Sequence, residues 1–386
     1  MRIIFAILLC QCSLWAVAQS ATITISGKVQ DKATGEPLPF ASVGIKGKNV
    51  STVTNLHGEF DFHLPPEYRN EIMVISMLGY TSYEAPVWSH LTGGVQLILM
   101  EKSALLLREV VITDSLNAGE LFSIALASIE KNFPMEPFLL DGFYRDIKKV
   151  GGTHISLLEA AVQIYDENYK EPRNKFKLRE HVNLVEVRRS LGYENKFTAY
   201  FDQYNLLEDL LLHNDVRYRK IETDEEFFRD MKRERDSYYN GHEIYVVMYQ
   251  DNHLSQRIFI DKQDYSIMHI DYTMSATNEI VEKKNGMVSK FAGLTKSIDF
   301  RKFNGKMHLN FMTMTSKVNW YDGKSEKLRF ETELYQELLI NNVRNNSPQR
   351  ISSNEKMRNY GLQYQDLPYN KEFWDNYNVI KETPLD

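Results

Sequence analysis

The sequence is nearly free of cysteine, and its two cysteines lie close to the N-terminus. They are Cys10 and Cys12 of 386 residues. Both belong to a stretch in which Arg2 precedes an apolar run, and the run ends at the small-x-small site Ala16-Val17-Ala18. Such a stretch is typical of a secretory signal peptide. We therefore expect residues 1–18 to be cleaved on export, leaving a mature chain with no disulfide and no thiolate metal ligand.

The sequence also lacks an excess of basic residues and a second long apolar run. It has 46 Lys and Arg against 52 Asp and Glu, for a formal net charge of −6, which argues against nucleic acid as a partner. After the signal, no run approaches the roughly 20 apolar residues of a membrane helix. With 43% hydrophobic and 25% charged residues, the composition is that of a globular protein. We expect an exported protein that is soluble or peripheral to a membrane.

Motifs of the common hydrolases are absent as well. The serine-hydrolase run Gly-x-Ser-x-Gly does not occur. His242-Glu243 is followed by Val246 where a zinc peptidase needs its second histidine. Gly323-Lys324-Ser325 resembles the end of a phosphate-binding loop, but Val318 stands where the loop needs glycine. We predict a protein without catalytic residues, cofactor or metal.

Residues 23–101 have the pattern of a small antiparallel β-sandwich. Short runs alternate apolar and polar residues, and Gly, Pro, Asn or Asp marks each break. Thr34-Gly35-Glu36-Pro37 and Asn55-Leu56-His57-Gly58 have the composition of turns. We expect seven strands near residues 23–31, 40–46, 51–54, 59–64, 71–77, 81–87 and 95–100.

At fixed points this stretch resembles the carboxypeptidase-regulatory-like domain, a transthyretin-like β-sandwich. The matching positions are Gly27, Val29, Thr34-Gly35-Glu36-Pro37-Leu38, Ala41, Val43, Thr52, Thr54-Asn55, Gly58, Phe60 and Gly79-Tyr80. The resemblance implies this fold over residues 22–104. It also implies a place among exported and outer-membrane proteins of Bacteroidota, which include TonB-dependent receptors. It implies no peptidase activity, because the regulatory-like module is separate from the catalytic one.

A linker over residues 105–116 is expected to follow, since Leu107-Arg108-Glu109-Val110-Val111 resembles the run that follows this module in those receptors. Asp114-Ser115-Leu116 fits the O-glycosylation sequon of Bacteroidota. The alternative interpretation makes Ser115 or Asn117 the N-cap of an amphipathic helix that ends at residue 132.

Residues 117–340 have the pattern of an α+β domain on a large antiparallel sheet. We expect a second helix over residues 202–213, a charged helix or loop over 222–235, and hairpin turns at Asn304-Gly305 and Asp322-Gly323. The expected strands are 139–148, 153–165, 177–189, 243–249, 256–261, 267–275, 293–303, 307–321 and 327–340. The fold class is therefore mainly β, with a seven-stranded sandwich followed by an antiparallel-sheet domain. This second part resembles an uncharacterised region of exported Bacteroidota proteins.

The tail over residues 341–386 is polar at first and then rich in large apolar groups. The latter are Tyr369, Phe373, Trp374, Tyr377 and Ile380. Leaving each of them in water would forgo about 1.5–3 kcal/mol of burial free energy. We expect the tail to return and pack on the second domain.

Four residues are candidates for a binding site. Glu159 lies in an apolar run, where a half-buried acid more often pairs with an arginine such as Arg145 than does chemistry. Met268 and Met312 are candidates to line an apolar groove, should the helices leave part of the sheet uncovered.

These observations favour a non-enzymatic exported cell-envelope protein, in the periplasm or associated with the outer membrane. It would bind an apolar or amphipathic ligand or dock on an outer-membrane partner, and its oligomeric state stays open. The alternative is a hydrolase acting on glycan or peptide, with an acid pair that the sequence does not reveal.

Overall fold

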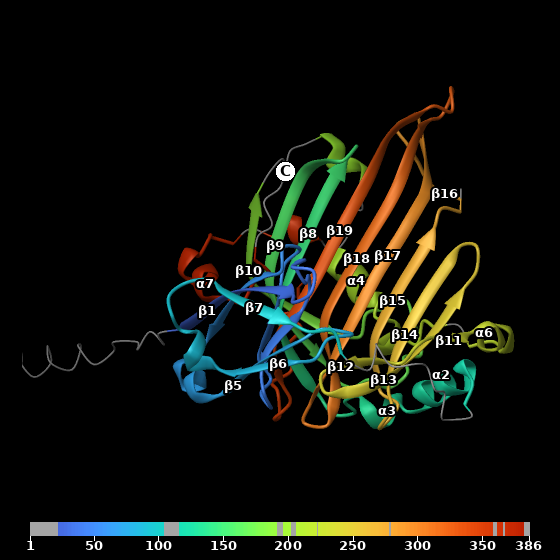
Figure 1. Ribbon diagram of the computed structural model, residues 1–386. Coiled ribbons are helices and arrows are strands. Elements are labelled where there is room, and N and C mark those ends of the chain that lie inside the picture. Colours follow the sequence, from blue (N-terminus) through green and yellow to red (C-terminus); the bar gives the residue numbers. More distant parts are fainter. Residues whose placement is uncertain are drawn as a thin grey trace, which may run out of the picture.

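The computed structural model describes residues 22–103, 116–190, 196–201, 206–221, 223–277, 279–357, 361–365 and 367–381. The expected signal peptide, nearly all of the expected linker and Ser115 lie outside these residues. The described chain is mainly β and consists of a small N-terminal sandwich beside one large antiparallel sheet (Figure 1). The predicted fold class is therefore confirmed.

The sandwich contains all seven predicted strands. One sheet has the order β4 (Glu59–Leu64), β1 (Ile23–Asp31) and β7 (Gln96–Met100). The other has the order β3 (Ser51–Val53), β2 (Ser42–Ile45), β5 (Ile72–Ser76) and β6 (Tyr83–Pro86). Two short 3-10 helices, η2 (Pro66–Asn70) and η3 (Val87–His90), connect strands at its ends. Alternate residues of both sheets fill a core of their own, which includes Ile25, Val29, Val43, Phe60, Phe62 and Ile75.

Gly58 shows why one turn of the sandwich requires glycine. Its φ is +74°, and a Cβ there would lie 2.4 Å from the carbonyl oxygen of Val29. The amide of Val29 donates to the carbonyl of Gly58 at 2.8 Å. A larger residue would therefore separate the turn from β1.

Within the described residues, twelve strands form the large sheet. Its main order is β10-β9-β8-β19-β18-β17-β15-β14-β13-β11, with β12 beside β13 and β16 beside β17. The bounds are β8 (Phe138–Val150), β9 (Thr153–Asp166), β10 (His181–Ser190), β11 (Lys232–Arg233), β12 (Ser237–Tyr239), β13 (His242–Gln250), β14 (Leu254–Asp261), β15 (Ile267–Ser275), β16 (Ile280–Lys284), β17 (Met287–Phe303), β18 (Lys306–Asp322) and β19 (Leu328–Arg344). Because β19 pairs with β8, the last strand joins the first hairpin of this domain to the rest of the sheet.

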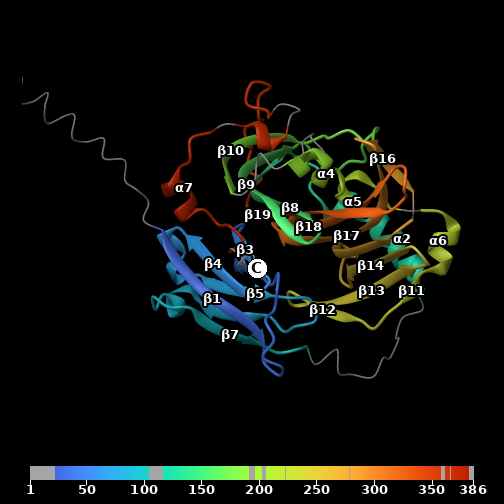
Figure 2. The same ribbon diagram turned by 90° about the horizontal axis from the view of Figure 1, so that it is seen from above.

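Five helices of the described chain lie on one face of this sheet, opposite the sandwich (Figure 2). They are α2 (Ala118–Ala127), α3 (Ile129–Asn132), α4 (Leu206–Leu212), α5 (Asp215–Tyr218) and α6 (Glu225–Asp230). Asn117 caps α2 in a capping box with Glu120, so Asn117 is the N-cap. The single helix expected up to residue 132 is divided at Ser128 into α2 and α3. None of the described helices is long and apolar enough to cross a membrane.

The other face of the sheet is covered by the sandwich and the tail. The tail contains η6 (Leu362–Tyr364), whose Leu362 packs in the core on the helix side of the sheet, and α7 (Lys371–Asn376). Trp374 and Ile380 are buried in one cluster with Phe143 and Leu339 of the sheet and Val53 of the sandwich. The tail is therefore part of the contact between the sandwich and the large sheet.

Polar contacts accompany this packing. Ser51 Oγ donates to the carbonyl of Ile340 at 3.0 Å, and Arg301 Nη1 donates to the carbonyl of Val50 at 3.2 Å. At the β4 edge, Asn378 Oδ1 accepts from the amide of His63 at 2.7 Å while its Nδ2 donates to the His63 carbonyl at 3.0 Å. Asn378 thus bonds the edge strand much as a neighbouring strand would.

Candidate functional site

Arg145 is the centre of a row of charges on the tail-covered face of the sheet. In the strand register it lies opposite Glu159 of β9 on one side and opposite Glu337 of β19 on the other. Arg145 Nε donates to Glu159 Oε1 at 2.7 Å, and Arg145 Nη1 donates to Glu337 Oε1 at 2.6 Å. The remaining Nη2 donates to the carbonyl of Ile380 in the tail at 2.6 Å. All three side chains are buried, and their donors and acceptors are matched.

Arg188 extends the row to β10. It lies opposite Glu159 in the register, and its Nε donates to Glu159 Oε2. Its guanidinium carbon lies 4.5 Å from the ring centroid of Trp374, a cation–π contact with the tail. The row therefore alternates in sign over four strands, Arg188, Glu159, Arg145 and Glu337, and carries no net charge.

Burial and pairing act in opposite directions within the row. Burial raises the pKa of Glu337, although the Arg145 guanidinium and the Tyr335 hydroxyl oppose the shift. Burial alone would lower the pKa of Arg145, but the carboxylates of Glu337 and Glu159 outweigh it and the pKa is raised. Both oxygens of Glu159 accept hydrogen bonds from arginines, so its carboxylate is held between two guanidinium groups.

A pocket of about 340 Å³ opens beside this row, between the β9–β10 edge and the tail. Its lining is Leu157, Glu159, Val187, Arg188, Arg189, Gln365, Leu367 and Tyr369. The lining combines the apolar side chains of Leu157, Val187 and Leu367 with two guanidinium groups, one carboxylate, one amide and one tyrosine. Of the sequence-predicted candidates, Glu159 lines this pocket and Arg145 lies behind it. Such a combination is suited to an amphipathic molecule with an anionic head.

Met268 and Met312 lie elsewhere, in the core between the sheet and the helices. Their exposed fractions are 3% and 0%, and both belong to the same cluster as Leu121 of α2 and Leu207 of α4. They do not line an open groove, contrary to the expectation from sequence. The reason is that five helices of the described chain cover this face of the sheet, whereas the sequence predicted two.

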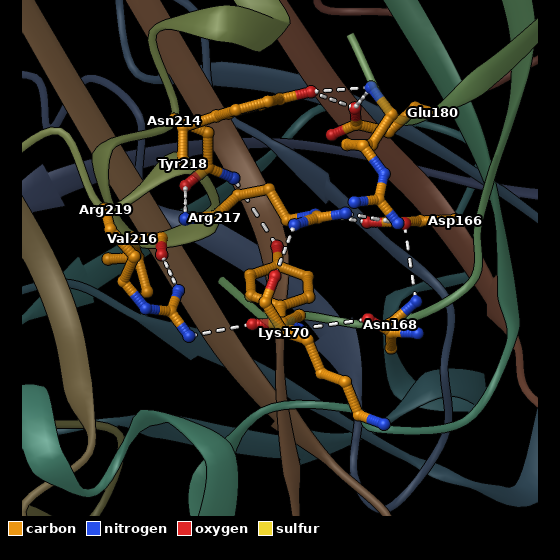
Figure 3. Close-up of polar contacts among 11 residues, drawn as sticks. Asp166, Asn168, Lys170, Glu180, Asn214, Val216, Arg217, Tyr218 and Arg219 are labelled. Atoms are coloured by element: carbon orange, nitrogen blue, oxygen red, sulfur yellow. Dashed lines mark hydrogen bonds and ion pairs between the residues drawn. The ribbon is translucent and has the colours of Figure 1, made fainter. Parts of the chain in front are cut away.

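A second buried charged network, which no sequence pattern predicted, lies at the end of β9 (Figure 3). Arg217 of α5 is buried, and its Nη2 donates to Asp166 Oδ1 at 2.9 Å. The Tyr218 hydroxyl donates to the carboxyl of Glu180. α5 has only four residues, too few to show a helical period, so no local pattern marked Arg217 as buried. Within the described residues, no group of three or more His, Cys, Asp and Glu side chains is placed to hold a metal ion.

Comparison with known proteins identifies the N-terminal part. Residues 25–112 match the family model of the CarboxypepD_reg-like domain, so the resemblance seen in the sequence is confirmed for this part. TonB-dependent receptor SusC of Bacteroides thetaiotaomicron is 33% identical over 100 residues, which are 26% of this chain and 9% of the receptor. The match therefore spans less than a tenth of that receptor.

Solved structures give only distant likenesses. A structure of lipid–protein interactions in lipovitellin matches 61% of this chain and 28% of its own, at 8% identity and a TM-score of 0.26. A protein of unknown function from Bacteroides fragilis matches 84% of this chain and 98% of its own, at 11% identity and a TM-score of 0.16. At these TM-scores neither likeness establishes a shared fold.

Proposed function

We propose that this chain is a non-enzymatic exported protein of the cell envelope that binds an amphipathic anionic molecule in the pocket at the β9–β10 edge. The observation that carries the proposal is the pocket itself, whose lining includes both apolar side chains and the guanidinium groups of Arg188 and Arg189. Apolar walls with a few placed polar groups are typical of small-molecule sites. An anionic head would bond the guanidinium groups while an alkyl part contacts Leu157, Val187 and Leu367.

The hydrolase alternative has less support. An inverting or retaining glycosidase needs two carboxyl groups that face its substrate. Glu159 is the acidic residue among those that line the pocket, and arginines occupy both of its oxygens. This pairing favours binding over turnover.

The sandwich supports a place near the outer membrane. It belongs to the CarboxypepD_reg-like domains and resembles the corresponding part of a TonB-dependent receptor. We infer that it positions the binding domain beside an outer-membrane partner. Fractionation of cells that express the full chain tests this: recovery with outer membranes supports it, and recovery in the cytoplasm contradicts it.

A fluorescence titration tests the pocket. The mature protein is titrated with dansyl-undecanoic acid, an anionic amphiphile, and with the neutral probe N-phenylnaphthylamine. Leu367→Asp should weaken binding of the acid by about tenfold or more, because burial of a leucine contributes about 1.5–3 kcal/mol. Leu328→Asp, at the exposed start of β19, is the matched control and should change nothing. Failure of the wild type to bind either probe, or equal losses in both variants, would overturn the proposal.

A further inference from the structure

The loop between β9 and β10, residues 167–180, is held in place by hydrogen bonds with α5 and Arg219. Arg217 Nη1 donates to the carbonyl of Lys170 at 3.1 Å, and Arg219 Nη2 donates to the carbonyl of Tyr169 at 2.7 Å. Lys175 Nζ returns a bond to the carbonyl of Arg219 at 2.9 Å. At the two ends of the loop, Asp166 bonds Arg217 and Glu180 bonds Tyr218. The loop is therefore ordered before any ligand arrives, which lowers the entropic cost of binding.

Residues of this loop line a second, open pocket of about 510 Å³. Its lining is Asn168, Lys170, Glu171, Arg173, Asn174, Lys177, Leu178 and Arg179. Four of these residues are cationic. In Figure 3 the side chain of Lys170 points away from the Arg217–Asp166 pair, so the buried acid does not neutralise it.

The acids near the pocket already have partners. Glu171 pairs with Lys175 at 3.2 Å, and Glu167 pairs with Arg350 at 3.1 Å. Asp166 is buried against Arg217. Among the residues that the structure describes, the four cationic side chains of the pocket form no ion pair with a carboxylate. A chain with net charge −6 thus places four cationic side chains and one carboxylate, that of Glu171, along one open pocket.

Apart from Glu171, the polar side chains that line the pocket offer donors that suit an anion. Two guanidinium groups present the planar fork that bonds two oxygens of one phosphate, and two ammonium groups act as point charges. Asn168 Oδ1 accepts from the amide of Lys170 at 3.1 Å, and Asn174 Oδ1 accepts from the amide of Phe176 at 2.9 Å. With their oxygens bonded within the loop, both asparagines have their amide nitrogens left as donors.

We propose that the β9–β10 loop is a binding site for a ligand that carries phosphate groups, separate from the amphiphile pocket. The loop precedes β10, whereas Arg188 and Arg189 lie near the C-terminal end of that strand. At about 3.3 Å per residue the two sites are roughly 25–30 Å apart. Lipid headgroups and soluble phosphorylated molecules present the same chemistry to this loop.

Calorimetry and vesicle flotation test the site and distinguish its two sources of ligand. The mature protein is titrated with inorganic pyrophosphate and floated with vesicles of phosphatidylglycerol or of phosphatidylcholine. The variant Arg173→Glu with Lys177→Glu reverses two exposed charges of the pocket. We expect it to weaken pyrophosphate binding by about tenfold or more, and binding by the wild type to weaken at high salt.

The matched control is Lys324→Glu with Lys327→Glu, two exposed lysines between β18 and β19 that change the net charge equally. Binding of pyrophosphate that only the loop variant loses supports a soluble ligand. A lipid headgroup is supported if the wild type floats with phosphatidylglycerol vesicles but not with phosphatidylcholine vesicles, and if the loop variant loses this flotation while the control keeps it. Absence of binding to both, or an equal loss in the control, overturns the proposal.

Discussion

Arg145 is the residue on which the charged row across β8, β9, β10 and β19 depends most. Arg145 bonds two buried carboxylates and a tail carbonyl. Replacing a whole buried ion pair by apolar groups is often harmless, but removal of one partner leaves a buried charge uncompensated.

We therefore predict that Arg145→Ala destabilises the protein by about 3–5 kcal/mol. Glu337 would lose its charged partner, and Glu159 would keep only Arg188. Urea unfolding measures the change. Arg229→Ala, at an exposed position of α6, is the control and should alter stability by less than about 0.5 kcal/mol. Equal effects of the two substitutions would contradict a structural role for the row.

Glu180 gives a pH dependence with a defined sign. Burial raises the pKa of Glu180 from 4.5 to about 7, and Asp166 adds to the shift. Between these two values the folded protein keeps a proton that the unfolded chain releases. The contribution of Glu180 to stability is thus full below pH 4.5 and is lost as the pH rises towards 7.

We predict that Glu180→Gln becomes more stable relative to the wild type as the pH rises from 5 to 8, since glutamine does not titrate and still accepts from Tyr218. Melting temperatures over this range provide the measurement. The matched control is the same change at an exposed position, Glu136→Gln. If the melting temperatures of Glu180→Gln and the wild type change in parallel with pH, the pKa of Glu180 is not raised in the folded protein.

At the scale of elements, the tail acts as a clasp on two parts of the molecule. Trp374 is 4% exposed and packs edge-on against Phe143, whereas Asn378 bonds the backbone of β4. The tail also runs beside β10, where the amide of Met357 donates to the carbonyl of Val182 at 2.7 Å. Two sheet edges that would otherwise be open are bonded in this way.

We predict that Trp374→Ala lowers the free energy of unfolding by about 3–5 kcal/mol, the usual cost of truncating a buried aromatic residue. Trp88→Ala removes a tryptophan that is 56% exposed and should have little effect. Denaturant unfolding of both variants gives the comparison. A chain shortened after Pro368 should likewise melt several degrees lower, and an unchanged melt would mean that the tail is only an appendage.

At the scale of the whole molecule, the sandwich and the large sheet have separate cores joined by a third cluster. Val53 belongs to that third cluster and not to the sandwich core. A charge at this position would be buried without a partner at the contact, while leaving each core complete.

We predict that the protein unfolds in one calorimetric transition and that Val53→Asp divides it into two, because the parts lose their coupling. The exposed Val281→Asp is the control and should keep the single transition. Residues 22–103 expressed alone should still melt cooperatively. A single, unshifted transition in Val53→Asp would show that this contact does not couple the two parts.

Local interactions explain what could be predicted from sequence. Asn117 caps α2 with its own side chain, and the Asn304-Gly305 turn closes the hairpin between β17 and β18 with both residues at positive φ. Arg145 and Glu159 lie on consecutive strands, so their pairing depends on one short hairpin. Such signals act within a few residues, and the sequence by itself therefore determined the sandwich, most of the strands and this ion pair.

Only the tertiary structure decided the rest. Arg145 meets Glu337 across 192 residues because β19 pairs with β8. Met268 and Met312 are buried because the helices cover the apolar face on which they lie. The pocket of the β9–β10 loop depends on Arg217, which bonds this loop although the loop lies about 50 residues earlier in the chain. Pairing of distant strands and coverage of a sheet depend on the free energy of packing the whole chain, which no single stretch of sequence contains.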